Sequence, residues 1–245
     1  MAFRVMYYLC LTCPTVEDTL TKIDEYVERG ADFLQIDMPS SDPFAGSDFI
    51  KEMMKNGLAQ NSSYDYYMDV LRSVRKKHPD IDLSVVVYTD VVETIGYRKY
   101  LDFLKEIGAK NNMIAGDLPE FRKMMDEEGV TYFRGFSYSD PEYDLEELMK
   151  LNLTEEDIVC TRTRRRVESI NRRYDTWEKR IALAKSYGLK AKIYAVAEIE
   201  TKEDMLERKN AGCDGAIIGN KLMRLWNEPD KLWKLFDEFQ SCVEK

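Results

Sequence analysis

The stretch Arg29–Asp37, RGADFLQID, joins a glycine at the end of a helix-period segment to a short apolar run. Glycine in this place suits the left-handed residue that closes a helix before the chain turns. The same arrangement recurs in IGAKNNMIAGD (107–117), EGVTYFRGFS (128–137), YGLKAKIYAV (187–196) and AGCDGAIIG (211–219). A repeated order of helix, glycine and strand predicts a sheet built from alternating strands and helices.

Following this pattern in both directions predicts eight strands and eight helices. The strands are expected at 3–11, 33–37, 83–88, 112–116, 131–136, 157–161, 190–196 and 214–218. The helices are expected at 16–29, 64–77, 97–107, 119–127, 142–150, 174–187, 202–210 and 229–243. Strict alternation requires parallel pairing, so the sequence predicts one closed (β/α)8 TIM barrel domain over residues 1–245. A doubly wound open sheet is the alternative, but no G-x-G-x-x-G follows the first strand.

The composition narrows the class of partner. A net charge of −9 argues against nucleic acid or an anionic membrane surface as the partner. The chain contains no apolar run long enough to span a membrane, and its start, MAFRVMYYLCLTCP, is typical of a first strand rather than a signal peptide. The five cysteines have no framework spacing, which favours reduced thiols and a cytoplasmic location.

The side chains available for chemistry are limited by the presence of a single histidine. His78 lies in the polar turn KKHPD, so a histidine triad or a histidine metal site is not expected, and no pattern predicts a cofactor. The Cys10-x-x-Cys13 pair has two interpretations. Both thiols can be packing residues, or Cys13 can lie at the start of the first helix with a lowered pKa, with Cys160 facing the same rim.

In (β/α)8 barrels the active site lies at the C-terminal ends of the strands. The residues expected there are Cys10, Cys13, Gln35, Asp37, Asp90, Asp117, Arg134, Ser137, Arg162, Arg164, Glu198, Gly219 and Asn220. Each acid in this group can simply cap the following helix. Clustered carboxylates also perturb one another's pKa and suit acid–base work, so Asp37, Asp90, Asp117 and Glu198 are candidate catalytic residues.

Several motifs resemble the tryptophan synthase alpha chain family, a family of TIM barrels that cleave indole-3-glycerol phosphate to indole and glyceraldehyde 3-phosphate. The segment GADFLQIDMPSSDPFA (30–45) is similar to the family's G-A-D-x-x-E-L-G-x-P-F-S-D-P-x-A-D-G, and Ser41, Asp42, Pro43 and Ala45 reproduce its S-D-P-x-A. GDLP (116–119) resembles the D-x-P after strand four, and AGCDGAIIGNKLM resembles the last strand with its phosphate-binding glycine. The likeness covers nearly the whole chain.

The resemblance also identifies two departures in the catalytic positions. The family's strand-two glutamate, a general acid–base group, is replaced by Gln35, and the aspartate of A-D-G, which binds the indole N–H, is replaced by Gly46. An amide cannot exchange a proton near neutral pH, so general acid–base catalysis by Gln35 is excluded. The resemblance therefore implies that cleavage of indole-3-glycerol phosphate is impaired.

The family's phosphate-binding loops are changed as well. TRTRRRVES after strand six replaces glycines with arginines, and AVAEIETKED after strand seven introduces Glu198 and Glu200, which would repel phosphate. The arginines can form a solvated face, or they can bind an anion. The candidate residues for a phosphate or carboxylate are Arg162, Arg164, Arg165, Gly219 and Asn220, the last two at the start of a short helix.

Three functions agree with these features. The first is a lyase-type enzyme that acts on a small anionic metabolite. The second is a non-catalytic subunit, because the resemblance implies that the loop with Pro39, Ser41, Asp42 and Pro43 contacts a tryptophan synthase beta-like subunit. The third is a small-molecule binding protein. The acidic rim favours the enzyme, and a homo-oligomer is the alternative assembly.

Overall fold

The computed structural model describes residues 2–137, 139–162, 172–196 and 199–244. The chain divides into two compact units, residues 7–132 (the N-terminal unit) and residues 1–6 with 133–245 (the C-terminal unit). The predicted single domain therefore stays a prediction. No helix within the described ranges has both the length and the apolar character needed to cross a membrane.

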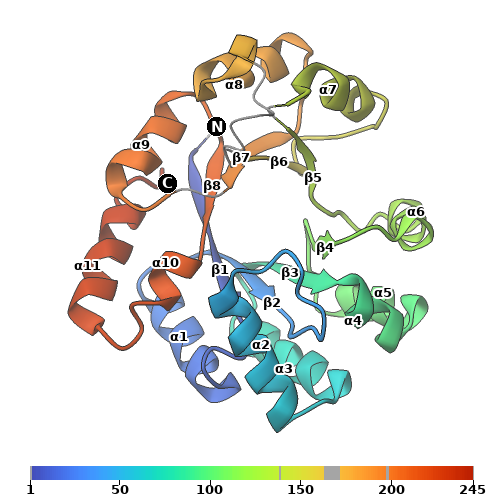
Figure 1. Cartoon of the computed structure of the whole chain (residues 1–245), viewed down its shortest axis with the longest axis vertical. Coiled ribbons are helices and arrows are strands. Elements are labelled where there is room, and N and C mark those ends of the chain that lie inside the picture. The colour runs from blue at the N-terminus through green and yellow to red at the C-terminus, as the bar shows by residue number, and fades with distance from the viewer. Residues whose placement is uncertain (1, 138, 163–171, 197–198, 245) are drawn as a thin grey trace. The chain divides into compact units, whose positions relative to one another are not determined.

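The N-terminal unit alternates strands and helices. Its elements are β1 (Arg4–Cys10, whose first residues belong to the C-terminal unit), α1 (Val16–Glu28), β2 (Phe33–Asp37), α2 (Asp48–Gln60), α3 (Tyr64–Lys77), β3 (Asp82–Tyr88), α4 (Thr89–Ile95), α5 (Tyr97–Glu106), β4 (Met113–Ala115) and α6 (Pro119–Glu127). Figure 1 shows α4 beside β3, and α4 also packs against α3 and α5.

The C-terminal unit continues the alternation. Its elements are β5 (Arg134–Phe136), α7 (Pro141–Met149), β6 (Ile158–Arg162), the 3-10 helix η2 (Arg172–Tyr174), α8 (Trp177–Ser186), β7 (Lys192–Val196), α9 (Lys202–Asn210), β8 (Gly215–Ile218), α10 (Asn220–Met223) and α11 (Pro229–Gln240). Within this unit α7 packs on β5 and α8, and α9 packs on β8 and α11.

The strands form one sheet in the order β4-β3-β2-β1-β8-β7-β6-β5. Every strand pair whose register is described is parallel: β1–β2, β2–β3, β3–β4, β5–β6, β6–β7 and β7–β8. A further parallel bridge joins Asn112, before β4, to Tyr132, before β5. Eight parallel strands that alternate with helices confirm the predicted (β/α)8 TIM barrel fold.

The predicted helix closures are confirmed. The five glycines have positive φ angles: 94° at Gly30, 60° at Gly108, 68° at Gly129, 78° at Gly188 and 93° at Gly212. Most residues other than glycine are strained in this region of backbone conformation. The glycine after each of these helices therefore explains why a sharp turn leads into the next segment.

Two helices of the N-terminal unit were missed from the sequence. The segment of α2 contains Gly57, which breaks the helical pattern, but a Cβ atom there would lie 2.3 Å from Cγ2 of Thr12. The glycine thus allows close packing of α2, which a local pattern does not reveal. Helix α4 has only seven residues, which is too short for a helical period to stand out in the sequence.

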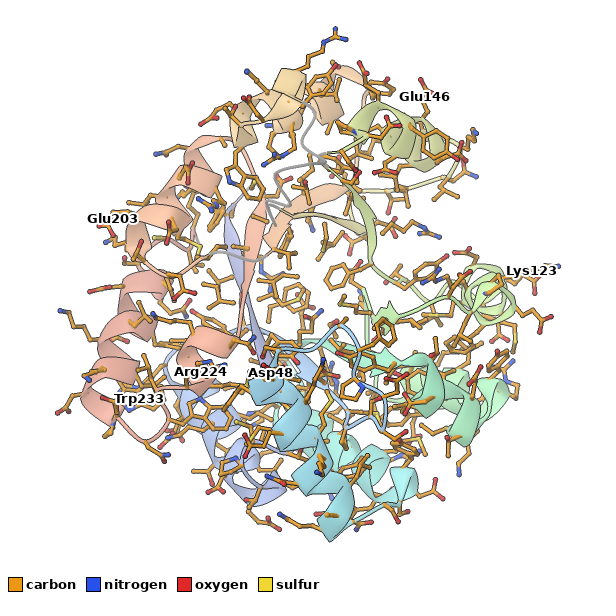
Figure 2. All side chains as sticks on the ribbon, viewed as in Figure 1. Asp48, Lys123, Glu146, Glu203, Arg224 and Trp233 are labelled. Carbon is orange, nitrogen blue, oxygen red and sulfur yellow. The ribbon has the colours of Figure 1, made fainter. Side chains whose placement is uncertain are left out.

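The helix predicted at 174–187 begins later in the structure, at Trp177. The 3-10 helix ends at Tyr174, and α8 begins at Trp177, where the side chain of Thr176 accepts a hydrogen bond from the backbone N–H of Lys179 at 3.3 Å. Four of the charged helix residues that Figure 2 labels, Asp48, Lys123, Glu146 and Glu203, are exposed, whereas Arg180 on α8 and Arg208 on α9 are buried. Buried polar and charged side chains, on these helices as well as near the strands, are therefore the unusual feature of the fold.

Candidate active site

Gln35 is buried in β2 and is held by hydrogen bonds within the N-terminal unit. Its Nε2 atom donates to Oγ of Ser84 at 3.3 Å, and that hydroxyl donates to the backbone oxygen of Asn111 at 2.7 Å. Ser84 lies directly beside Gln35 in the register of β2 and β3. The amide is therefore fixed by its neighbours on β3 and before β4, and it carries no titratable proton.

Asp37 lies two residues further along β2, so its side chain shares a face with that of Gln35. It is only 1% exposed, and the hydroxyl of Tyr8 on β1 donates to its Oδ2 atom at 2.5 Å. Within the described parts of the chain, its Oδ1 atom is buried and has no hydrogen-bond partner. Burial raises the pKa of the Asp37 carboxyl well above its ordinary value, although the hydrogen bond from Tyr8 opposes this shift.

Tyr8 is less buried than its partner. Tyr8 is of intermediate exposure, and it lies directly beside Gln35 in the register of β1 and β2. Burial, followed by the charges of Asp37 and Cys10, raises the pKa of the Tyr8 hydroxyl well above its usual value. Tyr8 therefore remains a neutral phenol over the physiological pH range and can both donate and accept a hydrogen bond.

The two cysteines near the end of β1 are buried thiols. Burial, with a smaller effect from the charge of Asp37, raises the pKa of Cys10 to about 12. Burial, with a smaller effect from Asp18, also raises the pKa of Cys13 to about 12. The suggestion that Cys13 has a lowered pKa at the start of the first helix is thus wrong, because loss of solvation outweighs its position in the chain.

Asp90 organises the loop that follows β2. Its Oδ1 accepts a hydrogen bond from the hydroxyl of Ser40 at 2.7 Å, and its Oδ2 accepts from the hydroxyl of Ser41 at 2.7 Å and from the backbone N–H of Ser41 at 2.9 Å. Burial alone would raise the pKa of Asp90, but these hydrogen bonds lower it overall. Asp90 therefore holds the loop containing Pro39, Ser41, Asp42 and Pro43, while its predicted catalytic role stays a prediction.

Gly46, at the end of the same loop, is crowded. A Cβ atom at this position would lie 3.2 Å from the backbone oxygen of Pro43, 3.3 Å from Cγ2 of Ile50 and 3.4 Å from the hydroxyl oxygen of Tyr88. The ring of Phe44 packs edge-on against Tyr88 with centroids 5.4 Å apart, although Phe44 remains 53% exposed. The space that a longer side chain at position 46 would need is therefore bordered by the phenol of Tyr88.

Asp117 has a different environment from the other two acids. Its side chain is 81% exposed, and its Oδ1 pairs with Nη1 of Arg122 at 3.1 Å. Arg122 also donates to the backbone oxygen of Gly116 at 2.6 Å. The pair ties the turn after β4 to α6, and the predicted catalytic role of Asp117 stays a prediction.

The predicted anion-binding residues belong to the C-terminal unit. Arg162 is the last residue of β6, opposite Val196 of β7, whereas Arg164, Arg165 and Glu198 lie outside the described residues. Asn220 begins α10, which follows Gly219, ends at Met223 and thus has a single turn. Nζ of Lys221 pairs with Oε2 of Glu200 at 2.8 Å, so the charge of this glutamate is offset.

Sequence reasoning identified Asp37 but missed Tyr8. The available signal was the spacing along the first strand. Tyr8 and Cys10 are two residues apart and so lie on the same face, as Gln35 and Asp37 do on the next strand. Within the described ranges, no group of three or more His, Cys, Asp or Glu side chains could hold a metal ion. What the N-terminal unit offers is thus a neutral phenol and a buried carboxyl.

The parallel (β/α)8 sheet, with its polar candidates at or after the strand ends, defines a TIM-barrel protein. A family model described as tryptophan synthase alpha chain matches residues 3–242. The chain therefore belongs to the tryptophan synthase alpha chain family, as its motifs indicate.

Individual relatives are distant. The tryptophan synthase alpha chain of Citrobacter koseri is 30% identical over 112 residues, which are 46% of this chain and 41% of that one, so this chain spans less than half the length of that relative. The corresponding chain of Proteus mirabilis is 23% identical over 239 residues, 95% of this chain and 88% of that one.

Solved structures share the fold at low identity. A structure from Aquifex aeolicus VF5 has a TM-score of 0.84 and 18% identity, and covers 100% of this chain and 94% of that one. A chain of the tryptophan synthase complex from Pyrococcus furiosus has a TM-score of 0.77 and 19% identity, and covers 98% of this chain and 100% of that one.

Proposed function

We propose that this chain is a lyase-type enzyme that acts on a small anionic metabolite and cleaves indole-3-glycerol phosphate poorly. The observation that carries the proposal is the buried amide of Gln35, fixed to Ser84, in the position of the family's general acid–base glutamate. Loss of one such group typically lowers the rate by about 10² to 10⁴. The buried Asp37 supplies a carboxyl group two residues away on the same face.

The anionic nature of the substrate is proposed from the C-terminal unit. Arg162 ends β6, and Arg164 and Arg165 follow it in the sequence. A guanidinium can bind two oxygens of a phosphate or carboxylate at once. The pairing of Lys221 with Glu200 supports the proposal, because this glutamate then opposes an anion less. Gly219 and Asn220 contribute less than a long helix would, since α10 is so short.

The experiment measures indole release by the purified chain from indole-3-glycerol phosphate. We expect negligible release, and Gln35→Glu combined with Gly46→Asp should restore little activity. A side chain at position 46 requires a small shift of its neighbours, because its Cβ would lie 3.2 Å from the backbone oxygen of Pro43 and 3.3 Å from Cγ2 of Ile50. Release at a rate typical of the family would overturn the proposal. Calorimetric titration of the wild type and of Arg162→Ala with inorganic phosphate tests separately whether the chain binds an anion through Arg162.

A non-catalytic subunit is the second candidate function. The observation that favours it is the exposed Phe44 on a loop that Asp90 holds in place. The relative from Pyrococcus furiosus was solved as a tryptophan synthase complex. We expect Phe44→Asp to abolish co-elution with a tryptophan synthase beta chain if this function is correct. Absence of co-elution for the wild-type chain would remove this candidate and leave a homo-oligomer as the remaining assembly.

A cytoplasmic location is part of the same proposal. All five cysteines are free thiols, and four of them are buried. Reduced thiols are typical of proteins from a reducing compartment. Labelling of thiols in the protein purified from its native host, without added reductant, tests the location: five reactive thiols after unfolding are expected, and fewer would contradict it.

A further inference from the structure

Tyr8 and Asp37 form a polar pair at the C-terminal ends of β1 and β2. The phenol hydroxyl and the Oδ2 atom of the carboxyl are 2.5 Å apart. Asp37 is 1% exposed, whereas Tyr8 is of intermediate exposure. Of the two partners, the tyrosine is thus the one that solvent and ligands can reach.

The register explains why this pair lies beside the amide that replaces the family's glutamate. Tyr8 is the direct neighbour of Gln35 across β1 and β2, and Cys10 is the direct neighbour of Asp37. Neighbouring parallel strands are about 4.8 Å apart, and residues two apart on a strand share a face. The hydroxyl of Tyr8 therefore extends forward from the level of Gln35 to the level of Asp37.

The carboxyl group can fix the direction of the phenol hydroxyl. Burial raises the pKa of Asp37, so this carboxyl keeps its proton to higher pH than an exposed aspartate does. In the structure the phenol hydroxyl donates to Oδ2 of Asp37. When that carboxyl carries a proton, the direction can reverse: the carboxyl donates to the phenol oxygen, and the phenol hydroxyl is then available to donate to a ligand. The thiol of Cys10, with a pKa of about 12, adds no charge nearby at neutral pH.

The hydrogen-bonding character of the site follows from these groups. A glutamate at position 35 would be an acceptor when ionised, whereas a neutral phenol beside a protonated carboxyl is a donor. Gln35 itself uses its amide N–H to bind Ser84. A substrate oxygen that only accepts hydrogen bonds therefore fits this position better than an N–H group does.

We propose that Tyr8 is a substrate-binding residue that donates a hydrogen bond to a carbonyl or enolate oxygen, and that Asp37 is its positioning residue. This inference rests on the proposed function and narrows its substrate to an anionic metabolite that carries a carbonyl group. A donor at this place stabilises negative charge that develops on the oxygen, which is the requirement for breaking a bond next to a carbonyl group.

The experiment compares two matched pairs of ligands by isothermal titration calorimetry. Dihydroxyacetone phosphate and glycerol 3-phosphate differ only in a carbonyl group against a secondary hydroxyl, and so do pyruvate and lactate. In the wild-type chain we expect the carbonyl member of at least one pair to bind about tenfold more tightly, which corresponds to about 1.4 kcal/mol. Tyr8→Phe should reduce this preference to about twofold or less.

Three further variants separate positioning from general damage. Asp37→Asn should keep most of the preference, because the amide N–H can donate to the phenol oxygen as the protonated carboxyl does. Asp37→Ala should lose the preference for the carbonyl compound, because the phenol hydroxyl is then no longer held in one direction. If Tyr8→Phe does not fold, Asp37→Ala is the variant that tests the proposal. Tyr143→Phe removes the hydroxyl of a tyrosine that is 59% exposed, and it should keep the wild-type preference.

The possible outcomes distinguish this inference from the proposed function. Equal binding of both members of each pair overturns the role of Tyr8 but leaves an anionic substrate in place. A preference that survives Tyr8→Phe also overturns the inference. Failure of all four compounds to bind would contradict both this inference and the proposal that the substrate is anionic. A preference that is lost in Tyr8→Phe and Asp37→Ala and kept in Tyr143→Phe supports the inference.

Discussion

Asp37 and Asp90 stand at or just beyond the C-terminal ends of neighbouring strands, yet their environments differ. Asp37 is buried with one described hydrogen-bond donor, Tyr8. Asp90 is half-buried and accepts three hydrogen bonds from Ser40 and Ser41. The pKa of Asp37 is raised by burial, whereas that of Asp90 is lowered because hydrogen bonds outweigh burial. The balance between burial and hydrogen-bond donors, rather than the position at a strand end, thus decides the direction in which the pKa of each acid shifts.

The largest expected effect concerns the pH dependence of stability at Asp37. Because its folded pKa is raised, its contribution to stability is complete below the unfolded pKa of about 3.9 and is lost as the pH rises toward the folded pKa. Asp37→Asn cannot ionise and escapes this loss. Its stability relative to the wild type should therefore increase above about pH 4, by at most about 1.4 kcal/mol per pH unit.

Urea unfolding at several pH values measures this slope. Glu146→Gln, which removes an exposed carboxyl group on α7, is the control and should show no comparable trend. A stability difference between Asp37→Asn and the wild type that does not change between pH 4 and pH 8 would show that folding does not raise the pKa of Asp37, and the contrast with Asp90 would fail.

Asp90→Asn should have the opposite dependence. An amide has one acceptor oxygen and cannot receive all the hydrogen bonds from Ser40 and Ser41, so we expect a loss of about 2–3 kcal/mol at pH 7. The folded pKa of Asp90 is lowered, so its contribution is present above the unfolded pKa and is lost as the pH falls through the folded pKa. The deficit of the variant should shrink below about pH 4. A deficit that is the same at pH 3 and pH 7 would contradict this explanation.

Ser41→Ala tests one donor at a time. The variant removes the hydroxyl that donates to Oδ2 of Asp90 and keeps the backbone N–H that donates to the same oxygen. We expect a loss of about 1 kcal/mol at pH 7, the usual contribution of one hydrogen bond. Ser62→Ala, at an exposed position before α3, is the matched control for urea unfolding. An unchanged midpoint for Ser41→Ala would mean that the backbone N–H of Ser41 and the hydroxyl of Ser40 are sufficient to fix the loop.

The fold could be predicted from the sequence because each helix-closing glycine and each apolar run is a local signal. The predicted strands all correspond to strands of the sheet, and Gly30 and Gly212 have the expected left-handed backbone. Helix α2 could not be predicted because its Gly57 is explained only by contact with Thr12, which is distant in the sequence. Local patterns contain no information on such packing.

The candidate site was predictable in position but not in chemistry. The spacing placed Gln35 and Asp37 on one face and Asp90 after the next strand. Whether a strand-end acid is buried, as Asp37 is, or bound by serines, as Asp90 is, depends on residues from other segments. Tyr8 was overlooked for the same reason, because its partner is 29 positions away along the chain.

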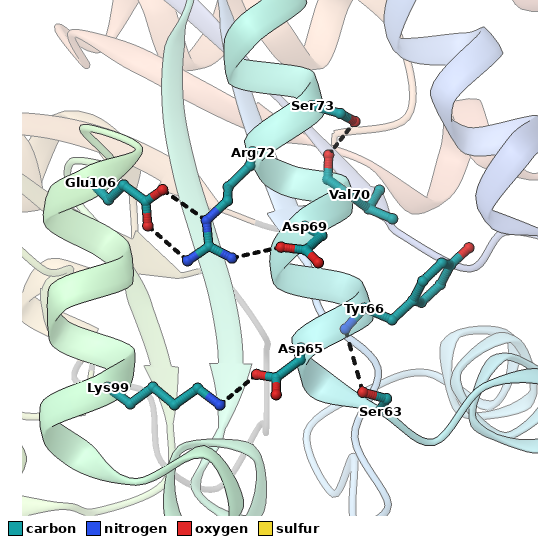
Figure 3. Close-up of polar contacts among 9 residues, drawn as sticks. All are labelled: Ser63, Asp65, Tyr66, Asp69, Val70, Arg72, Ser73, Lys99 and Glu106. Carbon is teal, nitrogen blue, oxygen red and sulfur yellow. Dashed lines mark hydrogen bonds and ion pairs between the residues drawn. The ribbon is translucent and has the colours of Figure 1, made fainter.

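The smallest expected effect is at an exposed network between α3 and α5, which Figure 3 shows. Arg72 binds both carboxylate oxygens of Glu106, at 2.8 and 2.7 Å, and also Oδ1 of Asp69 at 2.8 Å. Lys99 pairs with Asp65 at 2.5 Å in the same region. As at Asp90, one charged group makes several hydrogen bonds, although Arg72 donates them whereas Asp90 accepts them. The side chains of Arg72 and Glu106 are 36% and 53% exposed.

Water and salt screen exposed charges, so Arg72→Met should lower Tm by about 2 °C or less, and sodium chloride at high concentration should reduce the difference from the wild type. Lys99→Met, which removes a single ion pair, is the matched control and should change Tm even less. Differential scanning calorimetry at low and high salt measures both. If Arg72→Met destabilised the chain as much as Asp90→Asn does, the number of hydrogen bonds would matter regardless of exposure. Partial burial would then no longer explain why the loop after β2 depends on Asp90.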